Sequence, residues 1–334
     1  MSGTRIMHAG AARREGSGLI GWARSNRRWL KPLAAALVLG LAAFLLYRTL
    51  SRYDFDELLA SVKSIPLSRL GTALLFAAAS YFCLTLFDFL ALHYVGNPLP
   101  YRKAALASFT SLSLGHNIGF AALSSGAVRY RFYSRWGLDA EAVGKVILFC
   151  GVTVGLGLIA LGVLALTLRS ELAAEILGLS RAAIVALGAL CIAVPLAYLA
   201  MAMWVTQPLT IRGWSFAMPS LRIAAAQIVV GTANFACVAA CLHQVLLGVA
   251  EIPYLSVATV YVAANLASLV SHVPGGLGVI EAVVVHLLPD VPLIGAVLVF
   301  RFVYFLVPLM LGSLLFLTSE VVLRRAGGAS ATAA

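Results

Sequence analysis

The stretch SHVPGGLGVIE, from Ser271 to Glu281, interrupts an otherwise apolar part of the sequence. The run before it (YLSVATVYVAANLASLV) and the run after it (AVVVHLLP) are both typical of helix buried in a membrane. Backbone polar groups in hydrocarbon must be hydrogen-bonded, so irregular backbone is tolerated there only where protein buries it or a water-filled cavity meets it. A proline, three glycines and a carboxylate in this position therefore indicate a polar site inside a membrane protein.

The composition of the chain is that of a polytopic membrane protein. Among its 334 residues 61% are hydrophobic and only 11% are charged, whereas soluble domains carry about 25% charged residues. No stretch outside the apolar segments is long enough for a soluble catalytic domain, which counts against an enzyme, and we expect no cofactor. The five cysteines lie in apolar runs without a CxxC pair, so we expect packing residues rather than disulfides or metal ligands.

The net charge of +11 is expected to come from loops that face anionic lipid on the cytoplasmic side. We see no nucleic-acid module and expect no nucleic-acid partner. Met1 to Lys31 holds seven Lys and Arg residues against one acid, which predicts a disordered, basic, cytoplasmic N-terminus. A single integral membrane domain is expected over residues 32–325, followed by a disordered tail over residues 326–334.

Six runs are long enough to cross a membrane as helices, which takes about 20 apolar residues. They are Leu33–Leu50, Leu67–Tyr94, Ala142–Leu168, Ala182–Thr206, Leu221–Leu247 and Pro292–Leu323. Two further apolar regions are broken, Ala104–Val128 by GHNIG and Tyr254–Leu288 by HVPGGLG. The expected fold is therefore all-α, with about six full spans and two broken or re-entrant helical hairpins. The segment Asp54–Ile65 has one apolar face and predicts a short helix on the outer surface.

Flanking charges predict the side from which each broken region enters. Lys and Arg mark cytoplasmic loops, and they stand on both sides of the first region, at positions 102, 103, 129, 131 and 135. The second region is flanked by Glu251 and Asp290 without Lys or Arg, so both of its flanks are expected outside. Arg324 and Arg325 predict a cytoplasmic C-terminus. The charges predict two re-entrant hairpins that enter from opposite sides, and a count in which both hairpins cross fully stays open as the alternative.

The two broken regions also resemble each other. LHYVGNPLPY (Leu92–Tyr101) precedes the first, and LHQVLLGVAEIPY (Leu242–Tyr254) precedes the second. The Leu-His pairs lie 150 residues apart, the Pro-Tyr pairs 153, and the two tip histidines, His116 and His272, lie 156 apart. We interpret residues 67–168 and 221–323 as an inverted-topology repeat, in which a transporter's site lies at the repeat interface near the midplane.

The second break offers groups for binding an anion. Pro274 lacks a donor, and Gly275, Gly276 and Gly278 permit left-handed backbone, so the turn frees amides. The helix that follows then presents its positive end, which favours an anionic group such as a lipid phosphate. Glu281 lies about one turn into that helix. It is expected either to cap the freed amides or to pair with a cation or carry a proton.

The first break offers a matching set of polar residues. His116 and Asn117 lie at its tip, and the basic cluster VRYRFYSRWG follows. Arg129 and Arg131 are candidates to gather an anionic headgroup, although such a cluster is also an ordinary orientation signal. The arginines fan over different faces of a helix, so we do not expect all of them to contact one ligand. His116 and His272 lack clustered Cys or carboxylates, so we expect no metal site.

Arg301 is the most informative single residue because it lies about nine residues into an apolar helix, on the order of 14 Å deep. A charge near mid-membrane marks a functional site with a partner. We expect Glu281 to be this partner, with Asp88 as the alternative. The ion pair is expected to be functional, with a purely structural role as the alternative. Asp88 and Lys145 are expected nearer the interfaces, where they snorkel. Tyr304 completes the candidate lipid-binding set. The residues His243, Gln227, Asn234 and Asn265 are expected to hydrogen-bond between helices.

Three motifs carry a resemblance to a known family. SHVPGGLGVIE, LSSGAVRYRFYSRWGL (Leu123–Leu138) and FRFVYFLVP (Phe300–Pro308) resemble the lysylphosphatidylglycerol synthetase transmembrane family, over about Leu33 to Arg325. That family comprises the flippase part of the bacterial multiple peptide resistance factor and its stand-alone relatives. In full-length members a further membrane region and a phosphatidylglycerol lysyltransferase domain follow. The chain is therefore expected to be either a stand-alone relative or a truncated chain.

The resemblance implies a lipid flippase of the bacterial cytoplasmic membrane. Such a protein moves aminoacylated phosphatidylglycerol to the outer leaflet and so contributes to resistance against cationic peptides. Some relatives are linked to other lipids, which leaves the lipid open, and a homo-oligomer is also open. The sequence contains no GxxxxGK[ST] motif, so transport is expected to be passive or ion-coupled. The alternatives are a membrane subunit or partner of an aminoacyl or glycosyl transferase, and a small-ion channel.

Overall fold

The structure is a computed structural model that describes residues 55–331, apart from 119–120, 206, 212–213, 272 and 289–292. The expected first span Leu33–Leu50, the basic N-terminus and the candidate site residue His272 therefore lie outside the described residues. The expected surface helix is present as α3 (Phe55–Ser64), whose following residue Ile65 is buried against the rest of the protein.

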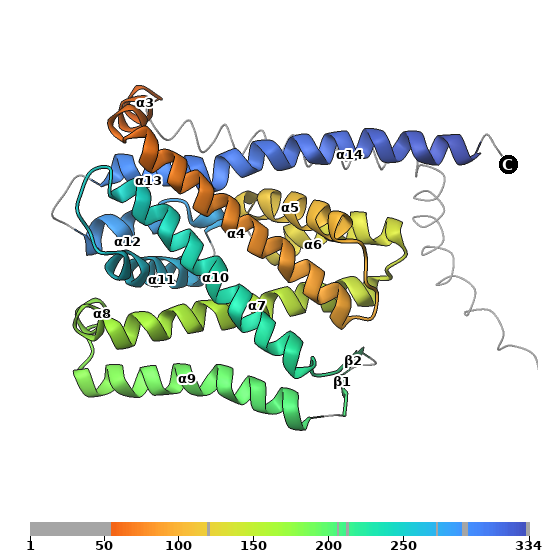
Figure 1. Cartoon of the computed structure of the whole chain (residues 1–334), viewed down its shortest axis with the longest axis horizontal. Coiled ribbons are helices and arrows are strands. Elements are labelled where there is room, and N and C mark those ends of the chain that lie inside the picture. The colour runs from red at the N-terminus through yellow and green to blue at the C-terminus, as the bar shows by residue number, and fades with distance from the viewer. Residues whose placement is uncertain are drawn as a thin grey trace, which may run out of the picture.

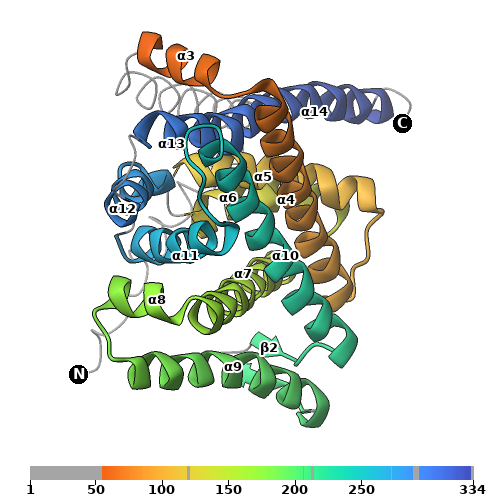
Figure 2. The ribbon, with the colours of Figure 1, turned by 60° about the vertical axis from the view of Figure 1, so that its left-hand side comes forward.

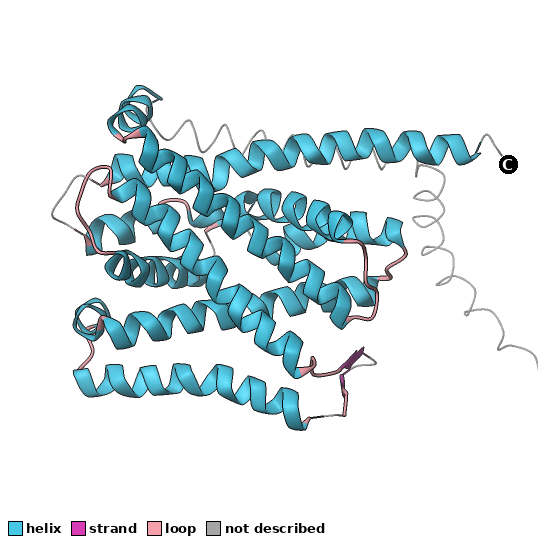
Figure 3. Cartoon of the chain, viewed as in Figure 1, coloured by secondary structure: helices cyan, strands magenta, loops and turns pink. Residues whose placement is uncertain are grey.

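The described part of the chain is helical apart from loops and one short β-hairpin (Figure 3). The helices of its first part are α4 (Leu67–Tyr94), α5 (Tyr101–Ile118), α6 (Ala121–Tyr133), α7 (Ala140–Leu168), α8 (Ser170–Leu177) and α9 (Arg181–Trp204). Strands β1 (Leu209–Ile211) and β2 (Trp214–Phe216) then pair antiparallel, with Thr210 opposite Ser215. The later helices are α10 (Leu221–Leu246), α11 (Tyr254–Ser271), α12 (Val279–Leu287), α13 (Ile294–Arg301) and α14 (Val307–Ala331).

Within the described ranges, six helical segments are long and apolar enough to cross a membrane. They are Leu67–Tyr94, Ala140–Leu168, Arg181–Trp204, Leu221–Leu246, Tyr254–Ser271 and Ile294–Glu320. The all-α, multi-pass fold expected from the sequence is thus confirmed. The six are not the six predicted, because Leu33–Leu50 is not described and α11, part of the second broken region, takes its place.

Both breaks form helical hairpins. Helices α5 and α6 pack against each other so closely that a Cβ on Gly115 would come within 2.8 Å of the Ser125 Cβ. Helices α11 and α12 form the second hairpin around a 3₁₀ turn, η2 (Pro274–Gly276). At 1.5 Å per residue the nine-residue α12 is about 14 Å long, well short of a hydrocarbon core of about 30 Å. This length favours re-entry over a full crossing, and re-entry stays a prediction.

The order of elements is the same in the two parts of the chain. A long helix, a hairpin and a second long helix follow one another as α4 to α7, and again as α10 to α14. Helices α4 and α10 lie side by side near the centre and run in opposite directions (Figures 1 and 2). That arrangement is what an inverted repeat requires, and it places the turns of both hairpins toward the middle of the molecule.

Two elements differ from expectation in the last predicted span. A π-helical turn, η3 (Phe302–Leu306), lies between α13 and α14. Helix α14 then continues to Ala331, so residues 326–331 are helical where the sequence predicts a disordered tail. Gly327 and Gly328 weaken a helix, but unlike proline they do not remove a backbone hydrogen bond, and the helix passes through them.

Helices α7 and α10 cross in near contact because each has a glycine at the crossing. A Cβ on Gly157 would lie 2.3 Å from the carbonyl carbon of Gly231. Small residues at such crossings let two backbones approach, which is how membrane helices gain packing without a hydrophobic driving force.

Replacing Gly157 by alanine tests this crossing. We expect Gly157→Ala to lower the free energy of unfolding by about 1–3 kcal/mol, because a methyl group must force the two backbones apart. The matched control is Gly155→Ala on the same helix, where a Cβ meets nothing within 4 Å. The measurement is detergent-solubilised unfolding of both variants. Equal stability of the two would contradict the close crossing.

Candidate functional site

A buried ion pair joins the second hairpin to the last long helix. Arg301 at the end of α13 binds Glu281 in α12 with two hydrogen bonds, from Nε to Oε1 and from Nη2 to Oε2, the latter 2.8 Å long. The residues are 4% and 5% exposed. The expected partner of Arg301 is thus confirmed, and the alternative, Asp88, is wrong.

The same pair satisfies the irregular backbone of the break. Arg301 also donates to the carbonyl oxygens of Gly275, at 2.8 Å, and Gly276, at 3.0 Å. Glu281 Oε2 accepts from the amide of Gly278 at 2.9 Å. The three glycines have φ of +61°, +58° and +83°, which only glycine adopts readily, following the turn that begins at Pro274. Glu281 therefore both caps an amide and pairs with a cation, two roles between which the sequence alone did not decide.

The π-helical turn η3 shapes the wall facing the first hairpin. Pro308 has no N–H to donate to the carbonyl of Tyr304 four residues earlier, and its ring crowds that turn. Tyr81 donates to the Tyr304 carbonyl at 3.4 Å, and Asn117 at the tip of α5 donates to that of Phe305 at 3.4 Å. Pro308 was thus the sequence signal for this turn, and π-turns are frequent at functional sites.

A cavity of about 270 Å³ lies between the tips of the two hairpins. The first tip contributes His116 to its lining, and the second contributes Gly275 and Gly276. The tips touch, since a Cβ on Gly275 would lie 3.3 Å from the His116 carbonyl oxygen. The remaining polar lining comes from α10, α11 and η3, through the side chains Asn234, Tyr261, Asn265, Ser268 and Tyr304. The structure thus brings four candidates, His116, Gly275, Gly276 and Tyr304, around one space, and the Arg301 side chain binds the carbonyls of the two glycines.

Hydrogen bonds between helices fix one wall of this cavity. Ser80 on α4 donates to Asn234 Oδ1 at 2.7 Å, and its hydroxyl lies 2.9 Å from Tyr304 Oη. Gln227 likewise reaches α7, donating to Thr153 Oγ1 at 2.8 Å. The expected interhelical roles of Asn234 and Gln227 are confirmed.

That expectation is wrong for the other two residues of the group. Asn265 binds Tyr261 one turn away on its own helix, and His243 binds the carbonyl of Ile252 in the loop that follows α10. Each of these two side chains thus finds a hydrogen-bond partner nearby in the sequence. An amide or imidazole in an apolar run therefore does not by itself indicate an interhelical contact.

A second buried ion pair joins the first hairpin to α4. Arg129 donates to both carboxylate oxygens of Asp88, at 2.9 and 2.7 Å, and the side chains are 3% and 0% exposed. Ser108 and Tyr133 donate to the same carboxylate, at 3.0 and 2.6 Å. The expectation that Arg129 gathers headgroups is wrong for this conformation, because the guanidinium does not reach the surface. Asp88 does not snorkel to an interface either, since its charge is neutralised in the core.

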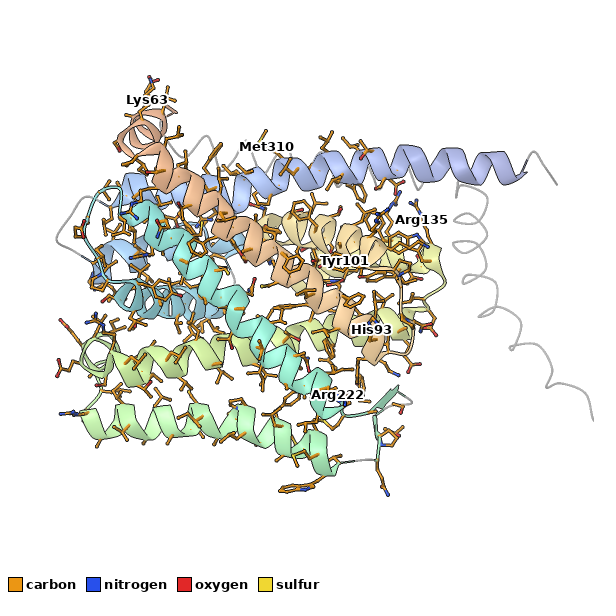
Figure 4. The ribbon with its side chains drawn as sticks, in the orientation of Figure 1. Lys63, His93, Tyr101, Arg135, Arg222 and Met310 are labelled. Atoms are coloured by element: carbon orange, nitrogen blue, oxygen red, sulfur yellow. The ribbon has the colours of Figure 1, made fainter. Side chains whose placement is uncertain are left out.

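The other two arginines of the basic cluster share one acid. Arg131 and Arg135 both pair with Glu320 near the end of the last candidate span, at 2.7 and 2.8 Å. Arg135 lies at the same end of the molecule as His93 and Arg222, whereas Lys63 lies at the opposite end (Figure 4). Arg129 thus pairs with Asp88 while Arg131 and Arg135 share Glu320, so the three arginines do not all bind one partner, as their helical spacing predicted.

Among the described residues, no three His, Cys, Asp or Glu side chains are grouped so as to hold a metal ion. Lys145 pairs with Glu141 one turn earlier on α7, at 2.8 Å, and is partly exposed. The cavity between the tips is therefore the strongest candidate site on the described chain.

These features define a helical membrane protein with a cavity between two broken helices that both polar and apolar side chains line, an arrangement found in transporters. The chain belongs to the family described as the lysylphosphatidylglycerol synthase TM region, whose model matches residues 33–312. It is 30% identical over 269 residues to slr0712 of Synechocystis sp., an uncharacterized protein, covering 79% of this chain and 84% of that one. It is 27% identical over 315 residues to the inner membrane protein YbhN of Escherichia coli, covering 89% and 95%.

Removing the acid of the second buried pair tests its structural role. We expect Asp88→Asn to lower the free energy of unfolding by about 3–5 kcal/mol, because it leaves the Arg129 charge buried without a counter-ion. The control is Glu141→Gln, which breaks the partly exposed pair with Lys145 and should cost less than about 1 kcal/mol. Denaturant unfolding in detergent measures both. Similar small losses would contradict a desolvated Asp88–Arg129 pair.

Proposed function

We propose that this chain is a lipid flippase of a bacterial inner membrane. In this proposal it moves an anionic or aminoacylated phospholipid, similar to lysylphosphatidylglycerol, from the inner to the outer leaflet. The observation that carries the proposal is the cavity between the two hairpin tips, with a buried arginine–glutamate pair directly behind its glycine wall. The family description and the printed name of YbhN as an inner membrane protein support the lipid class and the membrane.

The size and place of the cavity fit a headgroup rather than a whole lipid. Its volume of about 270 Å³ lies just below the roughly 300–1,000 Å³ of typical small-molecule pockets. A headgroup that enters such a space leaves its acyl chains among the apolar helix faces outside. This division lets the polar part cross inside protein while the apolar part stays in lipid.

In this proposal the Arg301–Glu281 pair lets the charged headgroup of a lipid pass through the middle of the protein. Arg301 binds a carboxylate with two parallel hydrogen bonds, a geometry that suits a phosphodiester equally well. Arriving phosphate would replace Glu281 on Arg301, and the amine of an aminoacyl group would then neutralise Glu281. With an aminoacylated lipid neither buried charge is left unpaired during this exchange, which keeps its cost small.

In this proposal fewer arginines of the basic cluster meet the lipid than the sequence predicts. Arg129 holds the first hairpin through Asp88 and does not touch the lipid. Arg131 and Arg135 are only partly buried, so they remain able to attract anionic headgroups from the cytoplasmic leaflet while Glu320 orients them. Reduction of negative charge on the outer leaflet, and with it resistance to cationic peptides, is the proposed consequence.

Leaflet-resolved transport of fluorescent phosphatidylglycerol in proteoliposomes tests the proposal. We expect Arg301→Lys to keep the charge but to lower the rate roughly tenfold, as when about 1.4 kcal/mol of charge-assisted hydrogen bonding is lost. Glu281→Gln should lower it similarly, because Arg301 loses its counter-ion. The matched control is Arg222→Lys at the exposed end of α10. Equal rates in all variants and in the wild type, at equal protein content, would contradict the assignment.

A further inference from the structure

We infer that the cavity between the hairpin tips is a subsite for a neutral, hydroxyl-bearing headgroup, namely glycerol or a sugar. The inference rests on the proposed function and specifies the part of the lipid that enters the cavity. It assigns the recognition of that part to His116, Asn265 and Ser268, which neither the charges nor the family description single out.

The lining carries hydrogen-bonding groups without charge. None of the described residues that line the cavity is Asp, Glu, Lys or Arg. Arg301 lies just behind the wall, with Nη1 3.9 Å from where a Cβ on Gly275 would stand. An ammonium group could therefore be neutralised only by Glu281 behind the glycine wall, and not by a carboxylate in the described lining of the cavity itself. A phosphate at the wall would still be within reach of Arg301.

One buried group in the lining lacks a partner. Nδ1 of His116 is buried and has no hydrogen-bond partner among the described residues. Such a group is rare in a folded protein, because losing its contact with water is costly unless another bond replaces it. The ring of His116 packs edge-on against Tyr81, which holds it in place at the tip of α5. A ligand hydroxyl suits this nitrogen in either tautomer, since a hydroxyl both donates and accepts.

The second hairpin supplies further groups on the side facing His116. Asn265 uses one N–H on Tyr261 Oη, at 3.0 Å, which leaves its other N–H and its oxygen for a ligand. Ser268 Oγ stands beside the turn, where a Cβ on Gly276 would come within 2.4 Å of it. Donors and acceptors from α5 and α11 thus line one space, which suits a group with several adjacent hydroxyls.

An apolar groove next to the cavity can hold an acyl chain of such a lipid. Its lining includes Val154 of α7 and Leu269 of α11. One turn along the same two helices, Leu158 and Leu266 line an apolar groove of about 260 Å³ between α7, α8, α9 and α11. The polar subsite therefore lies next to an apolar groove in which an acyl chain would lie.

Lipid binding to the full chain in detergent, measured by native mass spectrometry, tests the inference. The key comparison is phosphatidylglycerol against phosphatidyl-n-propanol, which has the same charge and carbon count but lacks both headgroup hydroxyls. We expect wild type to bind phosphatidylglycerol roughly tenfold more tightly, as two neutral hydrogen bonds would provide. Diglucosyldiacylglycerol, which has hydroxyls but no phosphate, separates a sugar-preferring site from a glycerol-preferring one.

Variants test whether residues of the cavity cause the preference for phosphatidylglycerol over phosphatidyl-n-propanol. His116→Phe should reduce binding of phosphatidylglycerol to the level of phosphatidyl-n-propanol and leave the latter unchanged. Asn265→Leu should reduce the preference in the same direction. The control is His93→Phe, an exposed histidine at the end of α4, which should keep the preference. If a variant fails to fold, the wild-type comparison of the two lipids still decides.

Two outcomes separate this inference from the proposed function. Equal binding of the two lipids by wild type, or a preference that survives in folded His116→Phe, would overturn the inference even if Arg301-dependent transport persists. A preference abolished in His116→Phe but retained in His93→Phe supports the inference. If that pattern appears while no lipid crosses the bilayer, the proposed function alone fails.

Discussion

The guanidinium of Arg301 makes a proline and three glycines compatible with the interior of a membrane protein. It binds one carboxylate and two backbone carbonyls, and that carboxylate in turn accepts from a backbone amide. Free backbone groups at this place would each cost several kcal/mol in hydrocarbon. The position of the second hairpin tip, and with it the wall of the cavity, depends on this set of bonds.

The first hairpin is also held in place by a buried, hydrogen-bonded ion pair. The Asp88–Arg129 pair lies within one half of the molecule and is closed on itself by Ser108 and Tyr133. Neither Asp88 nor Arg129 belongs to the described lining of the cavity between the hairpin tips. The Arg301–Glu281 pair, by contrast, lies behind a wall of glycines that faces the cavity. This difference is why transport is assigned to one pair and stability to the other.

The sequence predicts the features that depend on local chemistry. The breaks at GHNIG and HVPGGLG, the long apolar helices and the pairing of Arg301 with Glu281 follow from residue type, spacing and the cost of a buried charge. It does not predict that Arg129 is neutralised by Asp88, because that requires the relative register of α4 and α6, 41 residues apart in sequence. The local bonds of Asn265 and His243 and the cavity itself likewise depend on three-dimensional packing.

The central claim is that the bonds around Arg301 open when a lipid headgroup passes. Hydrogen–deuterium exchange of residues 273–281 in phosphatidylcholine vesicles, with and without added phosphatidylglycerol, measures this directly. Opening predicts faster exchange of these amides when phosphatidylglycerol is present, with α4 and α10 unchanged. The same exchange rate in both vesicles, together with measurable lipid transport, would contradict it.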